Sequence, residues 1–77
     1  MPKPAWALPT THELDTFLAL TIVQRGAALD AMTPSRRIAY AVAYAKRDGR
    51  EPYRVLDIFT RWQDQARDSL RSYGTPS

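Results

Sequence analysis

The sequence predicts an all-α fold, a small domain of three helices, and three observations support this prediction. Apolar residues recur at the spacing of a helix along most of the chain, and no stretch alternates apolar with polar residues as a strand does. The three glycines, Gly26, Gly49 and Gly74, each fall where such a stretch ends. A chain of 77 residues suits one small domain, whose core contributes a net stability of about 3–5 kcal/mol.

The first helix is expected over residues 11–25. Thr10 and Glu13 form a capping-box pattern at its start, because each side chain can accept a hydrogen bond from the other's backbone N–H. Gly26 provides its end. At about 100° per residue, one face of this helix is apolar. That face carries Leu14, Phe17, Leu18 and Ile22.

The same helix carries apolar residues on a second side. Leu20 and Val23 fall roughly opposite the first face. A helix that is apolar on more than one side is usually central in a core or shared with a partner. Because two-fold dimers are the commonest oligomers, we expect a homodimer that uses Leu20 and Val23.

The second and third helices have clear starts. Thr33 as N-cap and Pro34 at the first helical position begin a helix over residues 34–48. Pro52 begins a longer helix over residues 52–73. The apolar positions of these two helices are Ile38, Ala41, Val42 and Ala45, then Val55, Phe59, Trp62, Ala66, Leu70 and Tyr73.

These boundaries predict a single domain over residues 10–74, with Trp62 in its core beside Phe59 and the first helix. Residues 1–9 are expected to form a flexible Pro-rich arm, and residues 75–77 a disordered tail. No apolar run approaches the roughly 18 residues of a membrane span. We therefore expect a cytoplasmic protein without a membrane partner.

Residues suited to catalysis or metal binding are scarce. There is no cysteine, and one histidine, His12, falls in the first turn of the first helix, where a surface role is the default. The glycines fall at expected helix ends, so no glycine-rich loop is available to cradle a phosphate. We therefore expect no enzyme activity, no catalytic residue, no metal and no cofactor.

The positive charge is concentrated in the middle of the chain. The net charge is +3, but residues 33–54 alone hold six cations and two anions, a net of +4. Most of these cations are arginines, whose guanidinium donates hydrogen bonds in a fork that fits phosphate or carboxylate. Such a block is either a solvated helix surface or a binding site for nucleic acid or an acidic protein surface.

Four residues within positions 38–60 have a spacing that resembles the helix-turn-helix motif. Ala45 and Gly49 would allow the tight turn of that motif, and Val55 and Ile58 would pack its second helix on the first. An ordinary hairpin of a three-helix bundle accounts for the same four residues.

The resemblance implies that the start of the helix at 52–73 faces the major groove of DNA. Arg54 is then the candidate for a base edge, while Lys46, Arg47 and Arg50 would hold phosphates. The leading prediction is a small regulatory or accessory protein that binds nucleic acid, with DNA as the expected partner. The candidate residues are Arg36, Arg37, Lys46, Arg47, Arg50, Tyr53 and Arg54.

An alternative function uses another face of the helix at 34–48. Arg36, Tyr40 and Arg47 share one side of it, with Tyr44 on its flank. An exposed stripe of aromatic and arginine residues is typical of a protein-binding hot spot, so this stripe would dock on a larger acidic partner. If Tyr40 and Tyr44 instead cover the neighbouring helices, the stripe belongs to the core.

Overall fold

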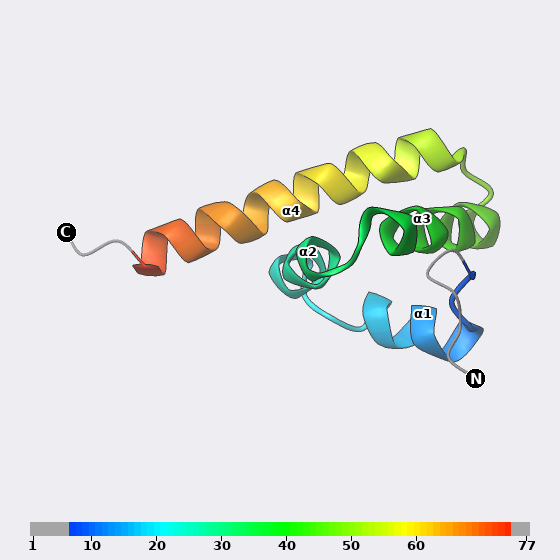
Figure 1. Ribbon diagram of the computed structural model, residues 1–77, viewed down its shortest axis with the longest axis horizontal. Coiled ribbons are helices and arrows are strands. Elements are labelled where there is room, and N and C mark those ends of the chain that lie inside the picture. The colour runs from blue at the N-terminus through cyan, green and yellow to red at the C-terminus, as the bar shows by residue number, and fades with distance from the viewer. Residues whose placement is uncertain (1–6, 75–77) are drawn as a thin grey trace.

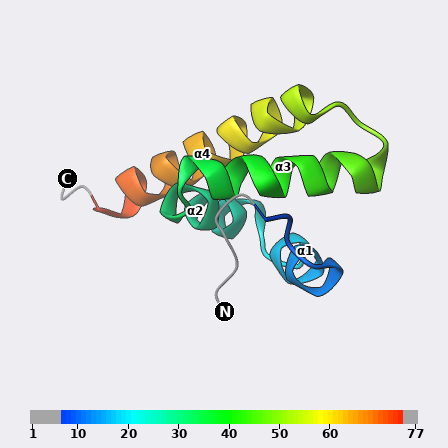
Figure 2. The same cartoon turned by 45° about the vertical axis from the view of Figure 1, so that its right-hand side comes forward.

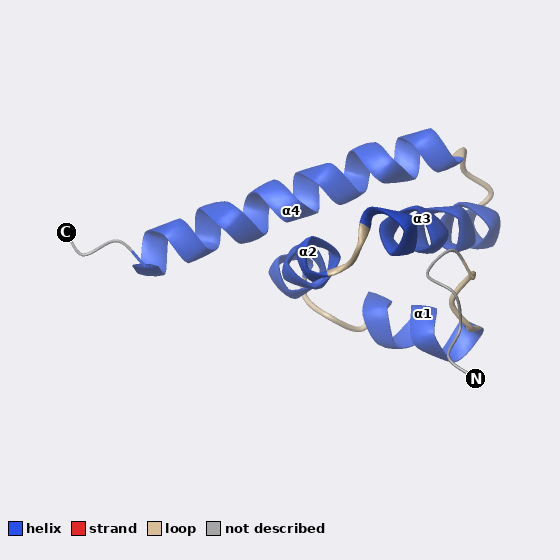
Figure 3. Cartoon of the chain, viewed as in Figure 1, coloured by secondary structure: helices blue, strands red, loops and turns tan. Residues whose placement is uncertain are grey.

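The computed structural model describes residues 7–74, with side chains described for residues 7–69. Within that part of the chain every regular element is a helix, so the all-α prediction is confirmed (Figure 3). The expected number of three helices is wrong, since residues 7–74 form four. Residues 1–6 of the expected arm and the whole expected tail lie outside the described residues. The helices are α1 (Thr11–Leu18), α2 (Ile22–Ala31), α3 (Pro34–Asp48) and α4 (Pro52–Gly74).

The longest helix, α4, lies at the centre of the helix packing. It packs against both α2 and α3, while α1 packs against α3. In both orientations α3 and α4 form an antiparallel hairpin, with α2 beside the middle of α4 (Figures 1 and 2). The α3–α4 turn therefore lies at one end of the molecule, away from α2.

The helix expected over residues 11–25 is divided in the structure, so this expectation is wrong. α1 ends at Leu18 and α2 begins at Ile22. Thr21 caps the second of these helices, because its hydroxyl accepts from the Gln24 N–H at 3.2 Å. The Gln24 side chain in turn accepts from the Thr21 N–H at 3.0 Å. This second capping box starts a new helix where the apolar pattern alone suggested continuity.

Arg25 holds the break between α1 and α2 in place. Its Nε donates to the Leu20 carbonyl at 3.0 Å, and its Nη2 donates to the Leu18 carbonyl. Carbonyls at the end of a helix have no partner within the helix, so these bonds satisfy groups that the break leaves open. The guanidinium carbon also lies 5.0 Å from the centre of the Trp62 ring. One arginine thereby links α1, α2 and α4.

Gly26 lies inside α2 and does not end a helix, contrary to expectation. It is buried against α4, where a Cβ atom would lie 1.9 Å from the Trp62 carbonyl oxygen and 2.9 Å from the Ala66 Cβ. The absence of a side chain at this position therefore sets how closely α2 and α4 approach.

The α3–α4 turn follows the expected pattern. Gly49 has a φ of 65°, in the left-handed region that glycine adopts without the cost a side chain brings. The N–H groups of Gly49 and Arg50 both donate to the Ala45 carbonyl, the latter at 2.9 Å. These bonds close the end of α3, and α4 then begins at Pro52 as expected.

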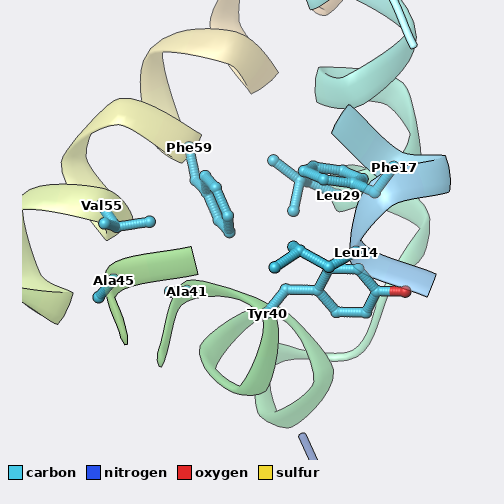
Figure 4. Packing of buried hydrophobic residues seen from close by; sticks show 8 residues of the cluster. All are labelled: Leu14, Phe17, Leu29, Tyr40, Ala41, Ala45, Val55 and Phe59. Atoms are coloured by element: carbon cyan, nitrogen blue, oxygen red, sulfur yellow. The ribbon is translucent and has the colours of Figure 1, made fainter. Parts of the chain in front are cut away.

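All four helices contribute to one buried cluster (Figure 4). Trp62 is partly buried and packs against it, with its ring stacked on that of Phe59 at 5.4 Å between centres. The expected position of Trp62 beside Phe59 is therefore confirmed. The cluster consists of Leu14, Phe17, Leu29, Tyr40, Ala41, Ala45, Val55 and Phe59.

Two aliphatic residues expected in the core are exposed instead. Ile38 is 52% exposed and Ile22 is 36% exposed. The reason in α3 is that the helix presents Tyr40 to α1, which turns Ile38 outward. The reason in α2 is the break before it, which makes Ile22 the first residue of a separate helix.

Candidate nucleic-acid interface

Arg36 is occupied by contacts within the fold. Its Nη2 lies 2.9 Å from Glu13 Oε2 on α1, and its Nη1 donates to the Ala7 carbonyl at 2.8 Å. Its guanidinium carbon lies 5.0 Å from the centre of the Tyr40 ring. Because the side chain is only 22% exposed, Arg36 ties α3 to α1 and offers little surface to a partner.

Arg47 is paired across helices in the same way. Its Nη1 contacts Asp15 Oδ1 on α1. Glu13 and Asp15 thus pair with two cations of residues 33–54. When these two carboxylates are counted with that segment, its net charge of +4 falls to +2. The basic character of this region is therefore weaker than the sequence alone suggests.

A third cross-helix pair joins Asp30 of α2 to Arg67 of α4. Arg67 Nη2 lies 2.8 Å from Asp30 Oδ1, and Gln63 Nε2 donates to the same oxygen at 3.0 Å. The hydrogen bonds from Arg67 and then from Gln63 hold the pKa of Asp30 below its ordinary value. The same pairing raises the pKa of Arg67, so this cation is also committed to the fold.

Of the two alternatives for Tyr40 and Tyr44 on α3, the structure shows the one in which they cover the neighbouring helices, so the exposed stripe is not formed. Tyr40 is 8% exposed, and its ring meets Phe17 edge-on at 5.3 Å between centres. Tyr44 is half-buried, with its ring 6.2 Å from Phe59 and 6.3 Å from Trp62. α1 and α4 cover this side of α3, so the tyrosines expected to dock on a partner pack inside the protein.

A group of residues near the α3–α4 turn keeps its cations available. Lys46 is exposed, and no described residue forms an ion pair with it. Arg50 Nε lies 3.7 Å from Asp48 Oδ2, a contact between largely solvated side chains. Arg54 has no carboxylate within ion-pair distance in the described part of the chain, and its Nε lies 3.5 Å from the Tyr53 hydroxyl. We call Arg50, Tyr53 and Arg54 the basic tip, whereas Lys46 lines a separate groove with Leu14 of α1 and Arg47.

A shallow groove begins at the basic tip and follows the first half of α4. Its residues recur every three or four positions, so they share one face of the helix. Arg61, which lies seven residues after Arg54, was not among the expected site residues, although this spacing already placed both on one side. Its Nη2 lies 3.3 Å from Asp57 Oδ2. The groove is lined by Arg50, Tyr53, Arg54, Asp57, Ile58 and Arg61.

The packing implied by the helix-turn-helix resemblance is present only in part. Ala45 and Val55 are buried in the core cluster, but Ile58 is half-buried and lines the groove. Tyr53 and Arg54, in the first turn of α4, are exposed as expected. At 23 residues, α4 spans about 34 Å. The contact with DNA that the resemblance implies stays a prediction.

The other expected site residues lie away from the basic tip. Arg37 is half-buried near the start of α3, where it lines a second groove with Ile38 and Leu56. Leu20, expected in a dimer interface, is half-buried and packs against the chain's own core. Val23 is 39% exposed. The structure therefore gathers only part of the expected set at one place.

Among the described residues, no group of acidic or histidine side chains is arranged to hold a metal ion. None of the described helices combines the length and the apolar character needed to cross a membrane. Comparison with known proteins finds no family model, no curated protein and no solved structure that matches this chain.

Proposed function

We propose that this chain is a small, non-enzymatic accessory protein that binds nucleic acid through the basic tip. The observation that supports this proposal is the distribution of ion pairs. Arg36, Arg47 and Arg67 each have a carboxylate partner on another helix. Arg54 has none among the described residues, and Arg50 has only a long contact with Asp48.

This difference matters because phosphate binding depends on available cations. A cation already neutralised within the fold gains little from a phosphate, whereas an unpaired one can replace the counterions that condense on nucleic acid. The guanidinium forks of Arg50 and Arg54 also suit phosphate oxygens better than a lysine ammonium does. Their place in and beside the first turn of α4 puts both on the groove described above.

The test compares two double variants that change the net charge equally. Arg50→Gln with Arg54→Gln removes two positive charges from the basic tip. Ala27→Glu with Gln65→Glu adds two negative charges at exposed positions outside the tip. Binding to labelled oligonucleotides is measured by fluorescence anisotropy over a range of salt concentrations. We expect the tip variant to lose binding and its salt slope to fall by about 0.7–0.9 per lost phosphate contact.

The control variant separates a local site from a general charge effect. If it weakens binding as much as the tip variant does, net charge and not the basic tip determines binding. If the unmodified protein binds no oligonucleotide at low salt, the proposed function is removed. Arg67 is unsuitable as a control, because its loss would also free Asp30 and disturb the fold.

The homodimer expected from Leu20 and Val23 stays a prediction. Of these two residues Val23 is exposed, and its neighbour Ile22 is exposed beside it. A standard interface buries about 800 Å² on each partner, which these two side chains alone do not supply. Sedimentation at high micromolar concentration tests it. A species of twice the chain mass that Val23→Asp converts to the single-chain mass would support the dimer. If only the single-chain species is seen at every concentration, the dimer prediction is wrong.

A further inference from the structure

Tyr53 is the most exposed of the large apolar side chains in the described part of the chain, at 61%. The other described tyrosines pack against aromatic rings of the core, but no described aromatic ring contacts Tyr53. Its neighbour is the Arg54 guanidinium, whose carbon lies 5.9 Å from the ring centre. An aromatic ring left in water beside a cation has a surface available for another flat group.

We infer that the nucleic acid bound by this site is single-stranded, and that one of its unpaired bases stacks on the Tyr53 ring. This inference rests on the proposed function and names the form of nucleic acid. Proteins that bind single strands combine a positively charged groove for the backbone with aromatic side chains on which bases stack. The groove on α4 has both parts: a ring at Tyr53, and guanidinium groups from Arg50, Arg54 and Arg61.

The structure favours a single strand over a duplex for two reasons. In a duplex each base is covered on both faces by its neighbours, so the Tyr53 ring would have no base face to stack on. A helix in the major groove is also flanked by two phosphate backbones, and carboxylates stand three residues before and three residues after Arg54. Glu51 and Asp57 are both exposed. Their negative charges would repel the two phosphate backbones of a duplex, whereas the one backbone of a single strand can avoid them.

The decisive experiment uses three labelled ligands of equal length: a single-stranded oligothymidylate, the matching abasic strand and a duplex. The abasic strand has the phosphate charge but no bases. We expect the full chain to bind oligothymidylate more tightly than either of the others at the same salt. Tyr53→Leu should weaken binding to oligothymidylate about tenfold or more and leave the abasic strand unchanged. Tyr53→Phe keeps the ring and should bind nearly as well as the unmodified protein.

The Tyr53 variants should remain folded, because the exposed Tyr53 side chain contributes little to the core. Thermal melting of each variant checks that it does. Equal binding of the abasic and base-bearing strands would overturn the inference but leave the proposed function standing. Tighter binding of the duplex would also overturn it, in favour of the groove contact that the helix-turn-helix resemblance implies. Failure of all three ligands to bind would remove the proposed function as well.

Asp57 provides a second, independent check. Its carboxylate lies in the groove and holds Arg61. Asp57→Asn should therefore strengthen binding of the single strand, because it removes a repelling charge and frees a guanidinium. Asp68→Asn makes the same charge change at an exposed position of α4 outside the groove. Equal effects of the two variants would show that the strand does not pass along this face.

Discussion

Single arginine side chains connect the helices of this protein. Arg25 satisfies carbonyls at the end of α1 and covers the Trp62 ring, and Arg36 joins α3 to α1. The planar guanidinium suits this work, because it donates in several directions and can lie over a ring at the same time. In a domain with a small core, such contacts help to fix the relative positions of short helices.

Asp30 depends on one of these contacts. It lies in the last turn of α2, where the partial negative charge of the helix end disfavours a carboxylate. The hydrogen bonds from Arg67 and Gln63 offset that effect and lower its pKa. Because the folded pKa lies below the unfolded one, the stabilisation is complete above the unfolded pKa and is lost as the pH falls through the folded pKa.

We therefore expect an acid-dependent difference between the protein and Asp30→Asn. The asparagine variant should be less stable near neutral pH, and the difference should shrink as the pH drops below about 4. Urea denaturation midpoints over a pH series measure it. A difference that stays constant down to about pH 2.5 would mean that the Asp30 carboxylate does not contribute through its charge.

At the scale of whole helices, the fold depends on the close crossing of α2 and α4 at Gly26. The helix-forming tendency of alanine exceeds that of glycine by about 1 kcal/mol, which would favour Gly26→Ala in an isolated helix. In the protein the added Cβ would meet the backbone of α4 at Trp62, at a distance that no relaxation of side chains can relieve. The helices would have to separate.

We expect Gly26→Ala to destabilise the protein by about 2–3 kcal/mol, the upper part of the range for an overpacked core. The next residue provides the matched control. Ala27 is exposed, so Ala27→Gly should cost only the difference in helix propensity, about 1 kcal/mol. Thermal melting of both variants decides the matter. A higher melting temperature for Gly26→Ala would contradict the close approach of α2 and α4.

The same pair of helices shows what the sequence could and could not predict. Local signals predicted α3 and α4 well, since caps, prolines and Gly49 depend only on neighbouring residues. Gly26 was misassigned because its role is a contact with Trp62, far along the chain. The break before α2 was detectable from Thr21 and Gln24, but the continuous apolar pattern across it favoured one helix.

For the whole molecule, the candidate site was only partly predictable for a similar reason. Net charge over a stretch of sequence is a local quantity, and it predicted a binding site within residues 33–54, the stretch that includes Arg50 and Arg54. Which of its arginines remain available depends on α1, because Glu13 and Asp15 neutralise Arg36 and Arg47 only once α1 packs on α3. Tertiary packing thus reduces a broad basic block to the basic tip.

For the whole molecule, Trp62 is the residue at which all four helices meet. Its ring lies 6.3 Å from Phe17 of α1, 5.0 Å from the Arg25 guanidinium of α2 and 6.3 Å from Tyr44 of α3. On α4 it stacks on Phe59. Removing this ring would therefore open a gap that every helix borders, and no single helix could shift to fill it.

We expect Trp62→Ala to cost about 3 kcal/mol, near the lower end for tryptophan because the side chain is only partly buried. The net stability of a domain this small is about 3–5 kcal/mol, so much of the variant population should be unfolded at room temperature. Trp62→Phe keeps a ring on Phe59 and should remain folded with a lower melting temperature. Far-ultraviolet circular dichroism and urea denaturation measure both variants. A Trp62→Ala variant with the full thermal transition of the unmodified protein would mean that the helices pack around Phe17, Tyr44 and Phe59 without it.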